Sequence, residues 1–198
     1  MNEKIGKREE KKIRAEKAIL TAANKLFRER GFSGTSLALI METAGLAVGT
    51  FYNYFGSKEE VLMNLLKNLF SRVGEKVAEG RAENKNSSEL LELACMLTAE
   101  IVDENRFVLP LLRSSVEHSD NPEKMPPNSS PGFGRIFDEI IKEGQRRKEF
   151  RADIPPELIS ELFHSIYQAA AYSRINISFR ENIGLKLKII LSGLCRRD

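Results

Sequence analysis

Cysteine, histidine and tryptophan are scarce in this chain of 198 residues, which contains two Cys, two His and no Trp. Cys95 and Cys195 lie a hundred positions apart, so they form neither a disulfide framework nor a Cys-x-x-Cys motif. His118 and His164 have no cysteine near them in the sequence, and a zinc site needs three or four such ligands. We therefore expect no metal and no cofactor.

Long apolar runs are absent too. No stretch approaches the roughly 18 consecutive apolar residues of a membrane-spanning helix. The first 17 residues are rich in charge and lack the apolar core of a secretory signal. Hydrophobic residues still make up 41% of the chain, which is enough for a packed interior. The sequence predicts a cytoplasmic protein that does not bind membranes.

Catalytic signatures are also missing. The sequence contains no HExxH, GxSxG or P-loop pattern, so we assign no catalytic residue and expect no enzymatic activity. A binding protein is favoured. The alternative is a helical-bundle enzyme or small-molecule carrier that has no role with nucleic acids.

The alternation of apolar and polar residues that marks a β-strand is not found either, whereas helical periodicity recurs along the chain. Gly31 and Gly45 are suited to end the first two helices, and Ser87 or Ser88 is suited to begin a later one. Helices are expected over residues 13–27, 37–44, 47–55, 57–70, 88–104, 107–117, 132–149, 156–175 and 180–196, with a proline-rich loop over 118–131. The expected fold is all-α.

Charge is divided unevenly along the chain. Residues 1–58 contain eleven Lys and Arg against six Asp and Glu, a net charge of +5, and the remaining residues carry −2. This asymmetry favours an N-terminal segment that binds a polyanion such as nucleic acid. The alternative is a solvated helix face on which acidic and basic residues are interleaved.

The first 58 residues contain the most specific pattern. Two short helices joined by Gly45-Leu46-Ala47 follow a longer helix, as in a helix-turn-helix motif, whose second helix enters the major groove of DNA. The sequence over residues 15–62 closely resembles the N-terminal domain of the TetR family of bacterial transcriptional regulators. The segments that carry the resemblance are Ile19 to Phe32, Thr35-Ser36, Ala44-Gly45-Leu46, Gly49 to Phe55 and Ser57 to Glu60.

Further along, Gly144-Gln145, Glu149-Phe150-Arg151 and Asp153 resemble the turn that precedes the last two helices of this family. The resemblance implies a three-helix N-terminal helix-turn-helix DNA-binding domain over residues 1–58. It also implies a C-terminal helical bundle over residues 59–198 for ligand binding and dimerisation. The implied function is a repressor that binds a palindromic operator in double-stranded DNA as a homodimer and is released by a small apolar or amphipathic effector.

Candidate DNA-binding residues are polar, small or exposed apolar residues around the second and third helices. Hydroxyl groups and a lysine can reach phosphates, Gly49 lets the backbone approach DNA closely, and Val48 and Asn53 can contact a thymine methyl and an adenine. The full set is Thr35, Ser36, Val48, Gly49, Thr50, Tyr52, Asn53, Tyr54 and Lys58. For Tyr52 and Tyr54 the alternative is that they only pack against the protein and do not contact DNA.

Two positions depart from the family pattern. Ala47 stands where a serine cap is common, and Val48 stands where a lysine or arginine is common. Residues 31–57 contain no Lys or Arg, so a bidentate contact to guanine cannot come from this segment. Phe51 and Phe55 are assigned to the core that anchors the short third helix.

Two more sets of residues are expected in the C-terminal domain. The resemblance implies that large apolar residues line an effector cavity, with a plain helical core as the alternative: Phe70, Met96, Phe107, Leu111, Phe137 and Tyr167. The last two helices carry broad apolar faces suited to a four-helix dimer interface, with closure of the monomer's own core as the alternative. The expected interface residues are Phe163, Ile166, Ala170, Leu187, Leu191 and Leu194.

Overall fold

The computed structural model of the protein describes residues 6–108 and 133–195. Its elements are α1 (Lys7–Arg30), α2 (Leu37–Thr43), the 3-10 helix η1 (Val48–Asn53), α3 (Lys58–Ala82), α4 (Ser87–Glu104), the 3-10 helix η2 (Arg106–Val108), α6 (Phe133–Arg146), α7 (Pro156–Ala171) and α8 (Phe179–Leu194). Among these residues there is no β-strand, and one isolated bridge joins Phe150 to Cys195. The all-α expectation is confirmed.

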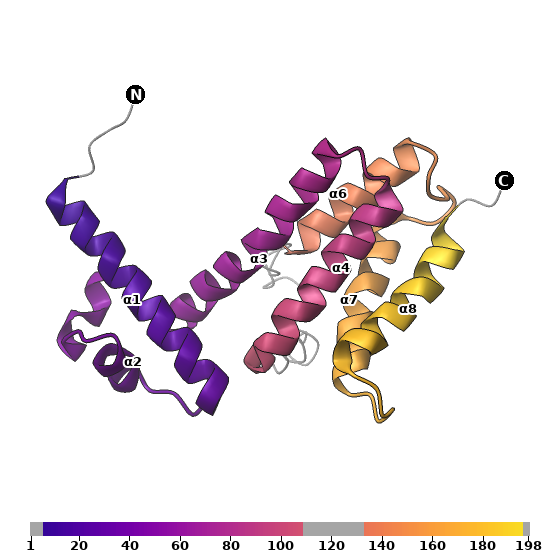
Figure 1. The fold of residues 1–198 in the computed structure, drawn as a ribbon. Helices are drawn as coiled ribbons and strands as arrows, with labels where there is room; N and C mark the ends of the chain where they lie inside the picture. The colour runs from indigo at the N-terminus through magenta and orange to yellow at the C-terminus, as the bar shows by residue number, and fades with distance from the viewer. Residues whose placement is uncertain (1–5, 109–132, 196–198) are drawn as a thin grey trace. The chain divides into compact units, whose positions relative to one another are not determined.

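The chain divides into two compact units, unit 1 (Met1–Asn68) and unit 2 (Leu69–Asp198). Helix α3 begins in unit 1 and ends in unit 2 (Figure 1). The boundary expected between residues 58 and 59 coincides with the start of this helix. The first turns of α3 belong to unit 1 and bury Val61, Leu62 and Leu65.

Unit 1 is built on the long helix α1, which packs against α2, while α2 packs against η1. Gly31 and Gly45 follow α1 and α2 with φ angles of 72° and 70°, a backbone conformation that favours glycine. Both helices therefore end where the sequence predicts. The buried apolar stripe of α1 consists of Ala15, Ile19, Ala22, Ala23, Leu26 and Phe27.

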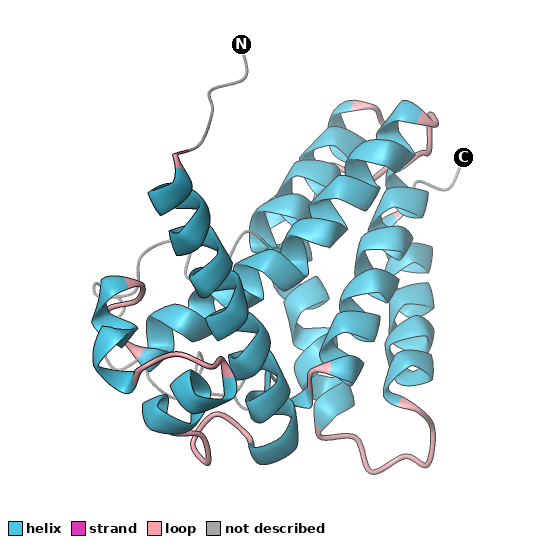
Figure 2. Ribbon diagram, turned by 60° about the vertical axis from the view of Figure 1, so that its left-hand side comes forward, coloured by secondary structure: helices cyan, strands magenta, loops and turns pink. Residues whose placement is uncertain are grey.

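Unit 2 contains a closed ring of four helices. Helix α4 packs against α6 and α8, α6 packs against α7, and α7 packs against α8; Figure 2 shows the helical layout from a second direction. Helix α7 begins at Pro156, as the sequence predicts. Helix α4 differs from the expectation because its cap is Asn86, which forms a capping box with Glu89. The helix and loop expected over residues 109–131 lie outside the described residues.

The turn after α6 holds one end of this ring together. The Phe150 ring lies so close to Gly144 that a Cβ atom there would be 2.2 Å from Phe150 Cδ2. The Gln145 side-chain nitrogen donates hydrogen bonds to the carbonyls of Arg151, at 3.0 Å, and Ile154, at 2.8 Å. The turn is thus fixed in two ways: Gly144 leaves space for the Phe150 ring, and the Gln145 amide binds the backbone that follows this ring.

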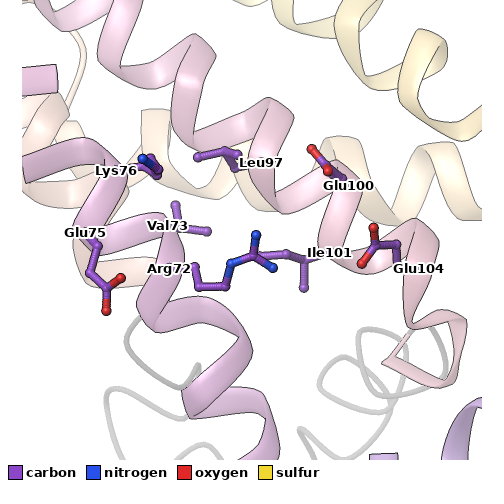
Figure 3. A pocket seen from close by; sticks show the side chains of 8 residues that line it. All are labelled: Arg72, Val73, Glu75, Lys76, Leu97, Glu100, Ile101 and Glu104. Carbon is purple, nitrogen blue, oxygen red and sulfur yellow. The ribbon is translucent and has the colours of Figure 1, made fainter. Parts of the chain in front are cut away.

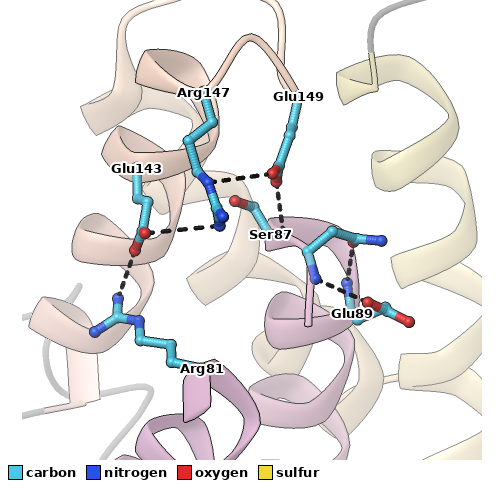
Figure 4. A network of polar contacts seen from close by, with 7 residues as sticks. Arg81, Ser87, Glu89, Glu143, Arg147 and Glu149 are labelled. Atoms are coloured by element: carbon cyan, nitrogen blue, oxygen red, sulfur yellow. Dashed lines mark hydrogen bonds and ion pairs between the residues drawn. The ribbon is translucent and has the colours of Figure 1, made fainter. Parts of the chain in front are cut away.

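A polar network links the same turn to two other helix ends (Figure 4). The backbone N–H of Ser87 donates to Glu149 Oε2 at 2.6 Å. Arg147 lies 3.5 Å from Glu149 and 3.8 Å from Glu143, which pairs with Arg81 at 3.2 Å. Burial disfavours the charge of Glu149, but the hydrogen bonds from Ser87 and the charge of Arg147 outweigh it and lower the pKa of this carboxyl. The end of α3, the start of α4 and the end of α6 are therefore joined.

Replacing Gly144 with alanine is expected to destabilise unit 2 by about 1–3 kcal/mol, the usual cost of overpacking. The added Cβ would also approach Ser87 Cβ to 2.9 Å, so neither neighbour has room to move away easily. The matched control is Gly193→Ala, because a Cβ atom at Gly193 meets nothing within 4 Å. Urea unfolding of both variants checks this; equal midpoints would contradict it.

Candidate nucleic-acid interface and associated sites

The short helix η1 presents most of its side chains to solvent. Val48 is 50% exposed and Tyr52 is 72% exposed, and Gly49 and Asn53 are exposed as well. A Cβ atom at Gly49 would meet nothing within 4 Å, so the surface there is open to a close approach. These four candidate DNA-binding residues are therefore accessible in the folded chain.

The inner side of η1 is held by aromatic packing. Phe51 and Phe55 are 1% and 6% exposed, which confirms their assignment to the core. The Phe51 ring packs edge-on against Tyr52, with ring centroids 5.4 Å apart, and lies 6.2 Å from the Phe55 ring. Tyr54 is half-buried. A segment too short to be stable alone is thus fixed on unit 1 by two buried rings.

The start of η1 lacks a side-chain cap, as Ala47 predicts, and the Thr50 hydroxyl donates instead to the Ala47 carbonyl at 2.7 Å. Ser36 caps α2 by accepting a hydrogen bond from the backbone N–H of Leu39 at 3.2 Å, and it is exposed. The hydroxyls of Ser36 and Thr50 thus fix the two helix starts of the motif.

Thr35 requires a correction. It is only 2% exposed, and its hydroxyl donates to the Gly31 carbonyl at 2.8 Å. The hydroxyl therefore points into the protein and closes the turn between α1 and α2, where it cannot reach a phosphate. Thr35 and Ser36 are adjacent residues that can both cap a helix. The sequence therefore does not show which of them caps α2 and which is buried.

Lys58 also differs from the expectation of a free phosphate contact. Its ammonium donates to the carbonyls of Phe32 and Thr35, both at 2.9 Å, and lies 4.3 Å from the centroid of the Phe32 ring. The first residue of α3 thus fastens the turn between α1 and α2 by two charge-assisted hydrogen bonds and a cation–π contact. No sequence spacing signals this contact, because the partners lie more than twenty positions apart.

Replacing Lys58 with methionine is expected to lower the free energy of unfolding by about 1–3 kcal/mol. The substitution removes two hydrogen bonds from a charged donor and leaves two part-buried carbonyls without that donor. Lys67→Met is the control, because Lys67 is exposed on the same helix. Thermal unfolding followed by circular dichroism measures both. If Lys58→Met melts like Lys67→Met, the contact does not stabilise unit 1.

The residues expected to line an effector cavity are mostly packed in the core of unit 2. Phe137 and Tyr167 are 0% and 2% exposed, and the Phe137 and Phe163 rings have centroids 5.6 Å apart. The Tyr167 hydroxyl donates to the Cys95 carbonyl at 3.0 Å. Phe70 and Phe107 are buried, Met96 is half-buried and Leu111 lies outside the described residues. In this conformation the described members behave as a helical core.

Cys95 belongs to the same core. Burial raises the pKa of its thiol to about 12, so the thiolate is not populated near neutral pH. Burial likewise raises the pKa of Tyr167 well above its ordinary range. Within residues 6–108 and 133–195, no group of three His, Cys, Asp or Glu is arranged to hold a metal ion.

A small cleft of about 90 Å³ lies elsewhere in unit 2, between α3 and α4 (Figure 3). Its floor is apolar and its rim is charged, and none of the residues expected to bind an effector lines it. The lining residues are Arg72, Val73, Glu75, Lys76, Leu97, Glu100, Ile101 and Glu104.

The expected dimer interface also needs a correction. Five of its residues are 1–7% exposed and fill the core of the single chain: Phe163, Ile166, Ala170, Leu187 and Leu194. Leu191 is half-buried. The apolar faces of α7 and α8 that do reach solvent are different ones. Their large exposed residues are Leu158, Leu162, Tyr172, Leu185 and Ile189.

Comparison with known proteins gives a family match within unit 1. A family model described as bacterial regulatory proteins of the tetR family matches residues 19–65. The HTH-type transcriptional repressor KstR2 of Rhodococcus jostii is 30% identical over 146 residues, which cover 71% of this chain and 70% of that protein. The fatty acid metabolism regulator protein of Bacillus subtilis is 24% identical over 182 residues, which cover 89% and 93%.

Solved structures share the fold over almost the whole chain. FadR of Thermus thermophilus, a TetR-family repressor in complex with lauroyl-CoA, matches with a TM-score of 0.69 at 24% identity and covers 92% of this chain and 96% of its own. FadR of Bacillus subtilis in complex with stearoyl-CoA matches with a TM-score of 0.72 at 21% identity, covering 89% and 98%. No described helix is both long and apolar enough to cross a membrane.

Proposed function

The chain belongs to the TetR family of bacterial regulatory proteins, and on this premise we propose that it represses transcription as a homodimer on a palindromic operator and is released by an amphipathic acyl ligand. The observation that carries the proposal is the exposed outer face of η1, held rigidly by Phe51 and Phe55. A helix-turn-helix protein inserts this element into the major groove. We infer no enzymatic activity and a cytoplasmic location.

The chemistry of the η1 surface defines how it reads DNA. Val48 offers an apolar contact to a thymine methyl, and Asn53 offers an amide that matches the edge of adenine. Ser36, Tyr52 and Tyr54 supply hydroxyl donors for phosphates, while Gly49 removes a side chain between protein and DNA. The Thr50 hydroxyl already donates to the Ala47 carbonyl, so the role proposed for it is to fix the start of η1. Because residues 31–57 contain no Lys or Arg, the proposed readout favours A·T base pairs.

Selection from a random pool of double-stranded DNA tests this readout. The wild-type chain is expected to select an inverted repeat with half-sites one helical turn apart, or a multiple of it, about 34–36 Å per turn. Asn53→Ala should relax the preference at one base pair of each half-site, at a cost of about 1–3 kcal/mol per contact. Tyr52→Phe should lower the affinity for all DNA sequences by the same factor, because it removes a hydroxyl that is proposed to contact a phosphate. Recovery of no shared sequence would refute the proposed function.

The second part of the proposal is a dimer formed through α7 and α8. Leu158 and Leu162 are exposed and four residues apart on α7, and Tyr172 directly follows that helix. Leu185 and Ile189 are exposed and four residues apart on α8. Pairing these faces across a two-fold axis would bury them in a four-helix interface. Leu191, which is half-buried, lies on α8 two residues after Ile189.

Ile189→Arg is expected to give a folded monomer, because Ile189 is 72% exposed and its replacement leaves the core of the protomer intact. Placing two unpaired charges at the centre of an apolar interface is costly. Met63→Arg serves as the control, since Met63 is a 44% exposed apolar residue on α3. Sedimentation equilibrium measures the mass of each. A dimer that survives Ile189→Arg would exclude this face.

The proposed effector is an acyl-CoA that occupies the core of unit 2 around Phe70, Met96, Phe107, Phe137 and Tyr167; the sixth expected residue, Leu111, lies outside the described residues. The FadR complexes with lauroyl-CoA and stearoyl-CoA support this class of ligand. Because Phe137 and Tyr167 are fully packed in the described conformation, an acyl chain must separate helices to enter. The ligand then prefers a second conformation, which is the condition for any coupling to DNA. Helix α3 belongs to both units and can transmit the change.

Titration of the selected duplex in the presence of lauroyl-CoA tests this coupling. Operator affinity is expected to fall about 5–150-fold, the range that a typical allosteric coupling of 1–3 kcal/mol produces. Coenzyme A without an acyl chain is the matched control and should leave affinity unchanged. Equal affinities with and without lauroyl-CoA would contradict an acyl effector while leaving DNA binding intact.

A further inference from the structure

An open groove of about 530 Å³ runs along unit 1 between α1 and the end of α2. None of the nine candidate DNA-binding residues named in the sequence analysis lines it, although its lysines belong to the basic N-terminal segment expected to bind a polyanion. Its walls are formed by one flank of α1 and the last residues of the second helix. The lining residues are Arg14, Lys17, Ala18, Thr21, Ala22, Lys25, Thr43 and Ala44.

The groove is strongly and uniformly basic. Arg14, Lys17 and Lys25 are exposed and lie on one flank of α1, because their spacing of three and eight residues returns to nearly the same side of a helix. No carboxylate lines the groove, and no ion pair of these three cations is present among the described residues. Lys12, elsewhere on the same helix, is paired with Glu16.

Small residues form the remainder of the groove. Ala18, Ala22 and Ala44 leave its floor without projecting side chains, and the Thr21 hydroxyl is bound to the Lys17 carbonyl at 2.8 Å. A groove with a smooth floor and positive walls is suited to a linear polyanion. It offers no large apolar residue with which to bind a helix or a lipid chain.

The groove adjoins the turn between the two helices of the helix-turn-helix motif. Thr43 and Ala44 directly precede Gly45, the turn that leads into η1 at Val48. The DNA-reading segment over residues 31–57 contains no Lys or Arg, and the ammonium of Lys58 is bound to two backbone carbonyls. The cations nearest to the helix-turn-helix that remain accessible are therefore those of α1.

We propose that this basic groove binds the sugar–phosphate backbone of DNA beside the bases that η1 reads, with Arg14, Lys17 and Lys25 contacting phosphates. The inference rests on the proposed function and extends the DNA contact to a helix outside the two helices of the motif. It assigns to α1 the sequence-independent part of the affinity, which η1 cannot supply.

The salt dependence of binding measures this contribution directly. Each phosphate contact adds about 0.9 to the slope of the logarithm of affinity against the logarithm of salt concentration. A homodimer carries each cation twice, so one substitution should reduce the slope by about 1.8 and the triple variant by about 5. Contacts that only orient the protein without touching phosphate would leave the slope unchanged.

The experiment uses the full chain with Arg14→Gln, Lys17→Gln and Lys25→Gln, singly and combined. Fluorescence anisotropy gives affinities between 50 and 200 mM KCl for two probes, the duplex selected by the wild-type chain and a 30-base-pair duplex of random sequence. The slope should fall on both probes, because phosphates are shared by every sequence. Lys67→Gln on α3 is the matched control for loss of one exposed charge, and its slope should equal that of the wild type.

Three different outcomes would overturn the inference, and they are distinguishable. If the wild-type chain binds both probes and the triple variant keeps the full slope, DNA binding stands and the groove is not a phosphate site. If the wild-type chain binds neither probe, the proposed function and this inference fail together. If Lys67→Gln lowers the slope as much as Lys17→Gln, the effect comes from net charge alone and the groove has no special role.

Discussion

The ammonium of Lys58 is the contact on which the DNA-reading surface depends. It binds the carbonyls of Phe32 and Thr35 and covers the Phe32 ring, so the start of α3 and the turn between α1 and α2 are held together. The segment between these points contains α2 and η1, which are too short to be stable in isolation. Fastening both ends of the segment and burying Phe51 within it gives η1 a fixed surface.

In the proposed mode of binding, η1 discriminates between bases and α1 binds phosphates. The outer face of η1 carries no charge, which suits discrimination between bases through apolar and amide contacts. Positive charge lies on α1, whose Arg14, Lys17 and Lys25 line a groove with Thr43 and Ala44, the residues before the turn at Gly45. Unit 2 has a comparable fixed point in the turn around Gly144 and Phe150, where the ends of α3, α4 and α6 are linked. Helix α3 takes part in both units, so its position is constrained at each end.

The sequence predicted the helical fold and most of the local structure because these depend on short-range signals. Gly31 and Gly45 end helices, Pro156 begins one, and the spacing of apolar residues marks Phe51 and Phe55 as core. The same reasoning could not tell which of two apolar faces on α7 and α8 is turned inward. Phe163 and Leu187 pack inside the chain while Ile189 is exposed, and both faces have similar composition.

Long-range contacts explain the other differences. The role of Lys58 is set by carbonyl groups more than twenty positions away, so neither residue type nor spacing reveals it. Thr35 binds the nearby Gly31 carbonyl, but only its burial in the folded unit shows that its hydroxyl points inward. The net positive charge of residues 1–58 predicts an N-terminal contact to a polyanion, but the sequence alone does not show which cations of α1 line one groove, because glutamates are interleaved with them.

Base analogues test most directly whether η1 reads DNA through apolar and amide contacts. In the selected duplex, each thymine is replaced in turn by uracil, which lacks the methyl group, and each guanine by 7-deazaguanine, which lacks N7. Losing one methyl contact of about 0.8 kcal/mol should weaken binding about fourfold at one thymine of each half-site. We expect this loss and no effect of 7-deazaguanine. Weakening by 7-deazaguanine, with uracil tolerated everywhere, would contradict it.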